Sequence, residues 1–187
     1  MTRKMQFKVS LLGEGMVGKT SLKNRIITGK FTELYLTTLG VDFGIHSVKM
    51  GDNDVQLAIW DIAGQKNFSS IREGYFEGSS GAIIVFDVTR PDTLTKIKDN
   101  WLVPFFEKLH SQLPILILAN KIDLQKERNV SNKQIEDYLT LIKTELELQQ
   151  TDLPFIEASV KDDINVLKAI EEFTKMLIKY HQTKLTH

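Results

Sequence analysis

The sequence predicts an α/β protein in which helices cover both faces of a mostly parallel β-sheet. Apolar segments of strand length alternate with segments of helical periodicity along the 187 residues. Residues 81–88 and 114–119 are almost continuously apolar, as expected for parallel strands buried on both faces, and residues 153–158 predict a last short strand. A glycine-rich turn joins the first strand to the first helical segment, which is the arrangement of a βα unit.

The amino-terminal third of the chain is expected to contribute three strands and one helix. Residues 5–12 are the first strand, and a helix follows from residue 18 to residue 28, with Gly29 as its carboxyl-terminal cap. Residues 41–50 and 53–61 alternate between polar and apolar side chains and are joined by a turn that begins Gly-Asp. They therefore predict a β-hairpin, which places one antiparallel strand at the edge of the sheet.

Three further helices are predicted in the second half of the chain. Residues 92–109 are apolar along one face, and Pro104 should bend this helix. Ser131 and Gln134 have the spacing of a capping box, which predicts that a helix begins there. The last helix repeats apolar side chains at four- and three-residue intervals, at Val166, Ile170, Phe173, Leu177 and Tyr180. This repeat is too short for a coiled coil, so we expect the helix to pack on the sheet.

The composition is that of one globular domain, residues 1–187, and it excludes several functions. Apolar residues make up 42% and charged residues 26% of the chain, and 24 basic residues balance 24 acidic ones. This charge balance gives no reason to expect nucleic-acid binding. The absence of cysteine excludes disulfides and a cysteine nucleophile, and it fits a reducing, cytoplasmic environment. No segment has the apolar length of a membrane span or the pattern of a secretion signal.

The sequence Gly-Glu-Gly-Met-Val-Gly-Lys-Thr at residues 13–20 is the G-x-x-x-x-G-K-[ST] phosphate-binding motif. Its glycines let backbone N–H groups surround a polyphosphate, and the helix that follows adds the positive end of its dipole. The Lys19 ammonium should reach the β- and γ-phosphates, and the Thr20 hydroxyl should bind Mg²⁺. The residues of this segment expected at the nucleotide are Gly13, Glu14, Gly15, Met16, Val17, Gly18, Lys19, Thr20 and Ser21.

The same segment also matches the G-x-G-x-x-G motif of dinucleotide-binding folds, through Gly13, Gly15 and Gly18. That fold needs an acidic residue about 20 positions further on, at the end of a second strand. Here the corresponding region, residues 31–40, reads as a loop, and the Lys-Thr pair has no role in dinucleotide binding. The phosphate-binding motif is therefore the favoured interpretation.

A second motif, Asp-Ile-Ala-Gly-Gln at residues 61–65, ends a predicted strand. The Asp61 carboxylate can hold Mg²⁺ through water, because Mg²⁺ keeps several of its waters in proteins. Gly64 would let the backbone approach a terminal phosphate. Gln65 can orient an attacking water, since its amide both donates and accepts hydrogen bonds.

A third motif, formed by Asn120, Lys121 and Asp123, follows the strand at residues 114–119. Guanine presents two donors on one edge, N1–H and the 2-amino group, and the Asp123 carboxylate can accept from both. Adenine would leave this carboxylate unpaired, and rejection of that kind can reach ~10⁴–10⁵. Asn120 would hold neighbouring groups, and the Lys121 stem would lie over the base. Alone, the second or third motif could be a simple turn, but all three should meet at one sheet edge.

These motifs resemble those of the Ras superfamily of small GTPases, most closely the Rab branch, over about residues 5–180. Residues 31–43 look like the first switch of that branch, and residues 157–161 look like its last guanine-contacting loop. The resemblance implies the phosphate-loop NTPase fold, with a six-stranded sheet and about five helices. It also implies that effectors read the loops at residues 31–43 and 61–76.

The resemblance implies roles for further residues. Phe31 would lie against the base, Tyr35 would cover the phosphates, and Thr38 would bind Mg²⁺ and the γ-phosphate. The loop residues near the base would be Ser159, Val160 (through its amide) and Lys161. The chain departs from the family pattern at Met16, where a small residue is usual, so this side chain must point away from the nucleotide or crowd the hydrolytic water. Thr37 replaces a common proline, and Lys66 replaces a glutamate of the Rab branch.

We therefore expect a GTP/GDP switch that hydrolyses GTP slowly and acts with a GTPase-activating protein, a nucleotide exchange factor and effectors. Lys19 and Gln65 would be its catalytic residues, and no arginine lies at residues 31–40 to assist from the first switch. Met16 and Lys66 keep open an alternative, a GTP-bound interaction module with negligible hydrolysis. An ATP-dependent small-molecule kinase shares the phosphate loop but has no use for the Asn-Lys-x-Asp motif. We expect a monomer with no lipid anchor on this chain, since it has no cysteine to lipidate. A lipidated tail lost after residue 187 and function without an anchor both stay open, as does membrane association.

Overall fold

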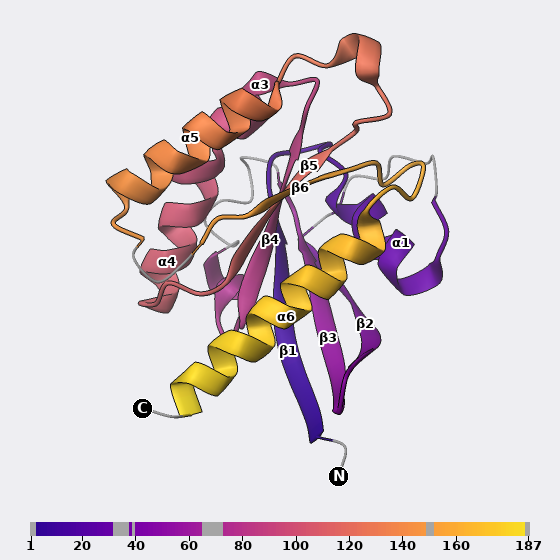
Figure 1. The fold of residues 1–187 in the computed structure, drawn as a ribbon, viewed down its shortest axis with the longest axis vertical. Helices are drawn as coiled ribbons and strands as arrows, with labels where there is room; N and C mark the ends of the chain where they lie inside the picture. Colours follow the sequence, from indigo (N-terminus) through magenta and orange to yellow (C-terminus); the bar gives the residue numbers. More distant parts are fainter. Residues whose placement is uncertain (1–2, 32–37, 39, 65–72, 149–151, 186–187) are drawn as a thin grey trace.

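The computed structural model of the protein describes residues 3–31, 38, 40–64, 73–148 and 152–185 and has the predicted α/β architecture (Figure 1). Within these ranges, six strands form one sheet in the order β2-β3-β1-β4-β5-β6. The β2–β3 pair is antiparallel and the other neighbouring pairs are parallel. The predicted hairpin therefore forms the antiparallel edge of the sheet.

The predicted strands are all present, to within two residues at each end. They are β1 (Arg3–Leu12), β2 (Val41–Met50), β3 (Asn53–Ile62), β4 (Gly81–Asp87), β5 (Ile115–Asn120) and β6 (Phe155–Ala158). The α-helices are α1 (Lys19–Thr28), α3 (Pro91–Thr95), α4 (Val103–Leu109), α5 (Asn132–Glu145) and α6 (Val166–Leu185). Short 3₁₀ segments lie at Glu73–Phe76 and Gln125–Glu127. The last strand begins later than predicted, after Pro154, which has no N–H to donate to the sheet.

The central strands separate two hydrophobic cores, one on each face of the sheet. Ile83 and Val85 of β4 pack in the core that contains α1 and α6, whereas Ile84 and Phe86 pack in the core that contains α3, α4 and α5. Every residue of β4 and β5 is buried, as their continuous apolar segments predicted. Figure 1 shows α6 crossing the strands on the face that also carries α1.

The last helix packs on the sheet, as predicted. The first four of its repeating apolar side chains are buried in one core, at Val166, Ile170, Phe173 and Leu177. Tyr180 is partly buried, and its hydroxyl lies 3.2 Å from the Ser111 hydroxyl. Among the helices of the described ranges, none combines the length and apolar character needed to cross a membrane.

The prediction of one bent helix at residues 92–109 is wrong in detail. The structure has α3, then a π-helical segment at Ile97–Leu102, then α4. Pro104 lacks the N–H that would donate to the carbonyl four residues earlier, and the neighbouring Val103 N–H donates to the Lys98 carbonyl, five residues earlier. The helix is therefore widened before the proline and not merely bent at it.

Both predicted helix caps are present. Gly29 has a φ of 69°, and its N–H donates to the Arg25 carbonyl. The Ser131 side chain accepts from the Gln134 N–H, and the Gln134 side chain accepts from the Ser131 N–H. These reciprocal bonds satisfy donors that a helix start otherwise leaves unpaired.

Replacing Ser131 by alanine should lower the free energy of unfolding by about 1 kcal/mol, because the hydrogen bond to the Gln134 N–H is lost. Thr140→Ala is the matched control: Thr140 is exposed within the same helix, and its hydroxyl bonds the Glu136 carbonyl. This control should be neutral or slightly stabilising, since alanine favours helix interiors. Urea denaturation measures both variants, and equal losses of stability would contradict a specific capping role.

Candidate nucleotide-binding site

The phosphate loop, defined as residues 13–18, leaves β1 at the carboxyl edge of the sheet and leads into α1. Gly13 has a φ of 130° and Gly18 a φ of 105°, values that residues with side chains rarely adopt. A Cβ at Gly13 would lie 2.1 Å from the Val85 carbonyl oxygen, and one at Gly18 would lie 2.4 Å from Asn120 Nδ2. Both glycines are therefore required by close packing as well as by backbone conformation.

Two side chains in and just after the loop differ in their exposure to solvent. The Met16 side chain is 69% exposed, so it points away from the protein, as expected for a bulky residue at this position. Lys19 is only 6% exposed, and its Nζ donates to the carbonyls of Gly13 at 2.7 Å and Glu14 at 2.9 Å. Gly64 lies against the same loop, since a Cβ there would be 2.5 Å from Lys19 Nζ. The loop thus holds an ammonium where phosphate oxygens are expected.

Three oxygen-bearing side chains meet beside the phosphate loop. Thr20 Oγ1 donates to Asp61 Oδ2 at 2.5 Å and lies 2.8 Å from Thr38 Oγ1. The Thr38 hydroxyl is 3.1 Å from the same carboxylate oxygen. These residues come from α1, from the segment before β2 and from the end of β3. The structure therefore brings together all three residues predicted at the metal.

The environment of the Asp61 carboxylate fits a bound cation. Burial raises its pKa, and a hydrogen bond from Thr20 and the nearby Lys19 charge offset this only in part. Among the described residues, its Oδ1 is buried without a hydrogen-bond partner. The described residues contain no cluster of three His, Cys, Asp or Glu that could hold a metal, so hydroxyls and nucleotide oxygens would complete the coordination. Mg²⁺ prefers such oxygen ligands and keeps waters, so these residues fit it.

The predicted base site is locked to the phosphate loop by hydrogen bonds. Asn120 Nδ2 donates to the Val17 carbonyl at 2.8 Å, and Asn120 Oδ1 accepts from the Val160 N–H at 3.1 Å. The Ser159 hydroxyl donates to Asp123 Oδ1 at 2.6 Å, which fixes the orientation of the carboxylate predicted to read guanine. The Val160 amide, expected near the base, thus bonds Asn120 here.

Arg25 of α1 is a residue of this site that sequence analysis missed. Its guanidinium donates to the carbonyls of Val160 at 3.2 Å and Lys161 at 2.7 Å. The guanidinium carbon lies 5.8 Å from the centre of the Phe31 ring. This contact brings Phe31 close to the loop at residues 157–161, called the base loop below. Ser21 is partly buried in α1. The predicted residues Tyr35, Gln65 and Lys66 lie outside the described residues.

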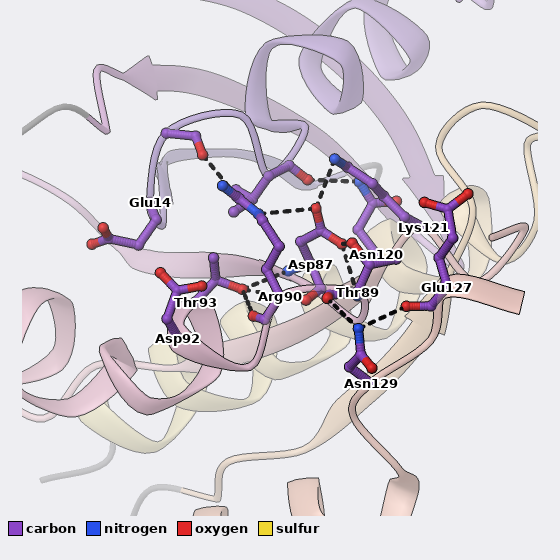
Figure 2. A network of polar contacts seen from close by, with 12 residues as sticks. Glu14, Asp87, Thr89, Arg90, Asp92, Thr93, Asn120, Lys121, Glu127 and Asn129 are labelled. Atoms are coloured by element: carbon purple, nitrogen blue, oxygen red, sulfur yellow. Dashed lines mark hydrogen bonds and ion pairs between the residues drawn. The ribbon is translucent and has the colours of Figure 1, made fainter. Parts of the chain in front are cut away.

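Asp87 and Arg90 connect the phosphate loop to the Asn-Lys-x-Asp motif, and sequence analysis missed them too (Figure 2). Asp87 ends β4 and is 1% exposed, and its Oδ2 lies 2.7 Å from Lys121 Nζ and 3.2 Å from Arg90 Nε. Arg90 Nη2 donates to the Gly15 carbonyl at 2.8 Å. Burial would raise the Asp87 pKa, but hydrogen bonds from Lys121 and Thr89 outweigh it and lower that pKa. The sequence offered one signal for Asp87, which is that an acidic residue ends an otherwise apolar strand.

The Glu14 side chain bonds the π-helical segment. One carboxylate oxygen accepts from Asn100 Nδ2 at 3.0 Å and from Trp101 Nε1 at 3.2 Å. The other oxygen lies 3.5 Å from Lys96 Nζ. Glu14 was predicted at the nucleotide, and with its carboxylate engaged in this way its backbone N–H is the group available for that contact.

Known proteins match this chain along most of its length. A model of the Ras family matches residues 8–179. Mouse Rab-21 is 45% identical over 136 residues, which are 73% of this chain and 61% of the mouse protein, so the match spans about three-fifths of that relative. Rab-1 of Theileria parva is 36% identical over 171 residues, covering 91% of this chain and 74% of the relative. Rab-7a of Paramecium octaurelia is 32% identical over 176 residues, covering 92% and 82%.

These matches agree with the geometry of the site. The family model covers the phosphate loop, the metal-site residues and the base loop together. The Theileria and Paramecium relatives align over more than two thirds of their own lengths, and every relative named here is a Rab protein. The chain therefore belongs to the Ras family and, within it, to the Rab branch.

Proposed function

We propose that this protein is a molecular switch that binds Mg²⁺ and GTP and slowly hydrolyses GTP to GDP. The observation that carries the proposal is the Asp123 carboxylate, oriented by Ser159 at 2.6 Å and joined to the phosphate loop through Asn120. This arrangement suits a ligand that has a guanine edge at one end and phosphates at the other. Membership of the Rab branch supports the same conclusion.

Hydrolysis would depend on positioning and on charge, as phosphoryl transfer generally does. The buried Lys19 ammonium would neutralise charge that develops on the β- and γ-phosphates, and Gln65 would orient the attacking water. Thr20, Thr38 and Asp61 would hold Mg²⁺, which supplies further positive charge to the phosphates when bound. Because residues 31–40 contain no arginine, turnover alone should be slow. An arginine from an activating protein adds about 10³–10⁵-fold in Ras-type enzymes.

The switch would be an order–disorder change controlled by the γ-phosphate. Thr38 bonds Thr20, which directly follows Lys19, and Gly64 lies against the phosphate loop, so both would be near a terminal phosphate. Loss of that phosphate would remove their contacts, and the segments 31–43 and 61–76 would relax. Effectors would distinguish the two states, and exchange and activating proteins would interconvert them. We propose that the protein does this as a cytoplasmic monomer.

A second candidate is a GTP-bound interaction module with negligible hydrolysis. Met16 keeps it open, because a long side chain stands in the phosphate loop at a position where a small residue is usual in the family. A partner or a conformational change that turned this side chain inward would crowd the attacking water. The two candidates bind the same nucleotide and differ in what happens to its γ-phosphate.

The nucleotide that co-purifies with the protein should be GDP, because slow turnover converts bound GTP during purification. Chromatography of the nucleotide released by denaturation measures its identity and phosphate count. Mostly GTP would favour the interaction module, and tighter binding of ATP than of GTP would favour a kinase. Calorimetry that detects no guanine-nucleotide binding in the presence of Mg²⁺ would reject both candidates.

Replacing Gln65 by leucine should slow single-turnover GTP hydrolysis about 100-fold, because the attacking water loses its orienting amide. Binding of GTP should change little, since the proposed role of this amide is to orient the water and not to hold the base or the α-phosphate. Gln6→Leu is the matched control, because Gln6 bonds Gln56 in β3 at the amino-terminal end of β1. Equal hydrolysis rates for wild type and Gln65→Leu would remove Gln65 from catalysis.

Replacing Asp61 by asparagine should weaken Mg²⁺ about 10–100-fold, because the carboxylate that orients the metal's water shell loses its charge. Release of GDP should then depend much less on Mg²⁺ than in the wild type. Asp54→Asn is the control, since Asp54 lies exposed near the other end of the same strand. Release rates of a fluorescent GDP measured across a Mg²⁺ titration test this, and an unchanged titration midpoint would exclude Asp61 from the metal site.

A further inference from the structure

We propose that Arg90 and Asp87 form a brace that holds the outer side of the phosphate loop and thereby slows nucleotide release. This inference rests on the nucleotide binding proposed above. A loop that points its N–H groups inward at phosphates must turn carbonyls outward, where they need donors of their own. Arg90 Nη2 supplies such a donor to the Gly15 carbonyl, at 2.8 Å.

The arginine is itself held by a buried carboxylate. Asp87 Oδ2 accepts from Arg90 Nε at 3.2 Å, and Asp87 Oδ1 accepts from the Thr89 hydroxyl at 2.7 Å and the Thr89 N–H at 2.9 Å. The planar guanidinium presents Nε to Asp87 and Nη2 to Gly15 in one fixed geometry, which a lysine cannot reproduce. The position of the guanidinium is thus set by the end of β4, a strand buried along its whole length.

The same carboxylate also holds Lys121 of the Asn-Lys-x-Asp motif. Lys121 Nζ lies 2.7 Å from Asp87 Oδ2, so Lys121 and Arg90 converge on one oxygen, as Figure 2 shows. The Thr93 hydroxyl, which is buried, donates to the Arg90 carbonyl at 2.7 Å and accepts from the Asp87 N–H at 3.0 Å. The phosphate loop and the lysine expected over the base therefore share one anchor, and neither can move freely while the brace is intact.

A second and independent contact limits the effect expected when the brace is removed. Glu14, the residue before Gly15, stays bound to Asn100 and Trp101. Without Arg90 the loop should therefore loosen at Gly15 without losing its shape. We expect a clear acceleration of nucleotide release and no loss of binding.

Arg90→Ala should release fluorescent GDP about tenfold faster than the wild type, with Mg²⁺ in excess. Arg90 is 38% exposed through its side chain, so this variant should fold. Arg90→Lys should restore slow GDP release only in part. Lysine keeps the positive charge, but it lacks the planar guanidinium that bonds Asp87 and Gly15 at once. Lys98→Ala is the matched control: it also removes a cation from the region after β4, but that cation pairs with Glu145 of α5 at 2.6 Å. Its release rate should equal that of the wild type.

Two further measurements separate the brace from other causes. Chelating Mg²⁺ should leave the ratio between Arg90→Ala and wild type unchanged, because Arg90 bonds the loop and not the metal-site residues. In an Asp87→Asn background, Arg90→Ala should have little further effect, since the anchor is already lost. If Asp87→Asn does not fold, the comparison of Arg90→Ala, Arg90→Lys and Lys98→Ala decides the matter.

If the wild type binds GDP and Arg90→Ala releases it at the same rate, the proposed brace is wrong. The brace is also wrong if Arg90→Ala and Lys98→Ala accelerate release equally, because the effect would then be a general loss of surface ion pairs. Failure of the wild type to bind GDP is a different result, which would reject the proposed function together with the inference built on it.

Discussion

The backbone conformation of the phosphate loop is the constraint on which the rest of the site depends. It requires the left-handed conformations of Gly13 and Gly18, and the neighbouring groups occupy the space that side chains at these positions would need. It also leaves loop carbonyls that need donors from side chains. Arg90 and Lys19 donate to three of these carbonyls, those of Gly13, Glu14 and Gly15. The shape of the loop is thus maintained by groups from other elements, and the nucleotide does not have to impose it.

Two buried carboxylates at this edge of the sheet have opposite pKa shifts, and the difference separates their roles. Asp87 faces two cations, Lys121 and Arg90, and bonds from Lys121 and Thr89 lower its pKa despite burial. For Asp61 burial prevails and raises the pKa, because the hydroxyls of Thr20 and Thr38 and the nearby Lys19 and Lys23 charges offset it only in part. A carboxylate paired directly with two cations is suited to holding the structure together, whereas one with cations only nearby is suited to a metal ion. The same residue type is therefore used once as an anchor and once for a ligand.

The two ends of the nucleotide site differ in how they are held. At the base end, Asn120, Asp123 and Ser159 bond to other protein groups, and Arg25 fixes the same loop from α1. At the γ-phosphate end, the metal-site residues Thr20 and Thr38 bond chiefly to Asp61 and to each other. The bonds at the base end thus link separate loops of the protein, whereas the two hydroxyls at the other end converge on one carboxylate. The first arrangement fits the proposed guanine site and the second fits the proposed Mg²⁺ site.

The sequence alone determined the features whose physical cause is local. Side-chain periodicity predicted the strands and the edge hairpin, cap residues marked two helix ends, and three short motifs at strand ends predicted the phosphate loop and which residues meet beside it. Tertiary structure alone decided which side chains support those motifs. Arg90 meets Gly15 across 75 positions, Trp101 meets Glu14 across 87, and Arg25 meets Val160 across 135. No periodicity or spacing encodes such pairs, because they arise only when the strand order of the sheet brings distant segments to one edge.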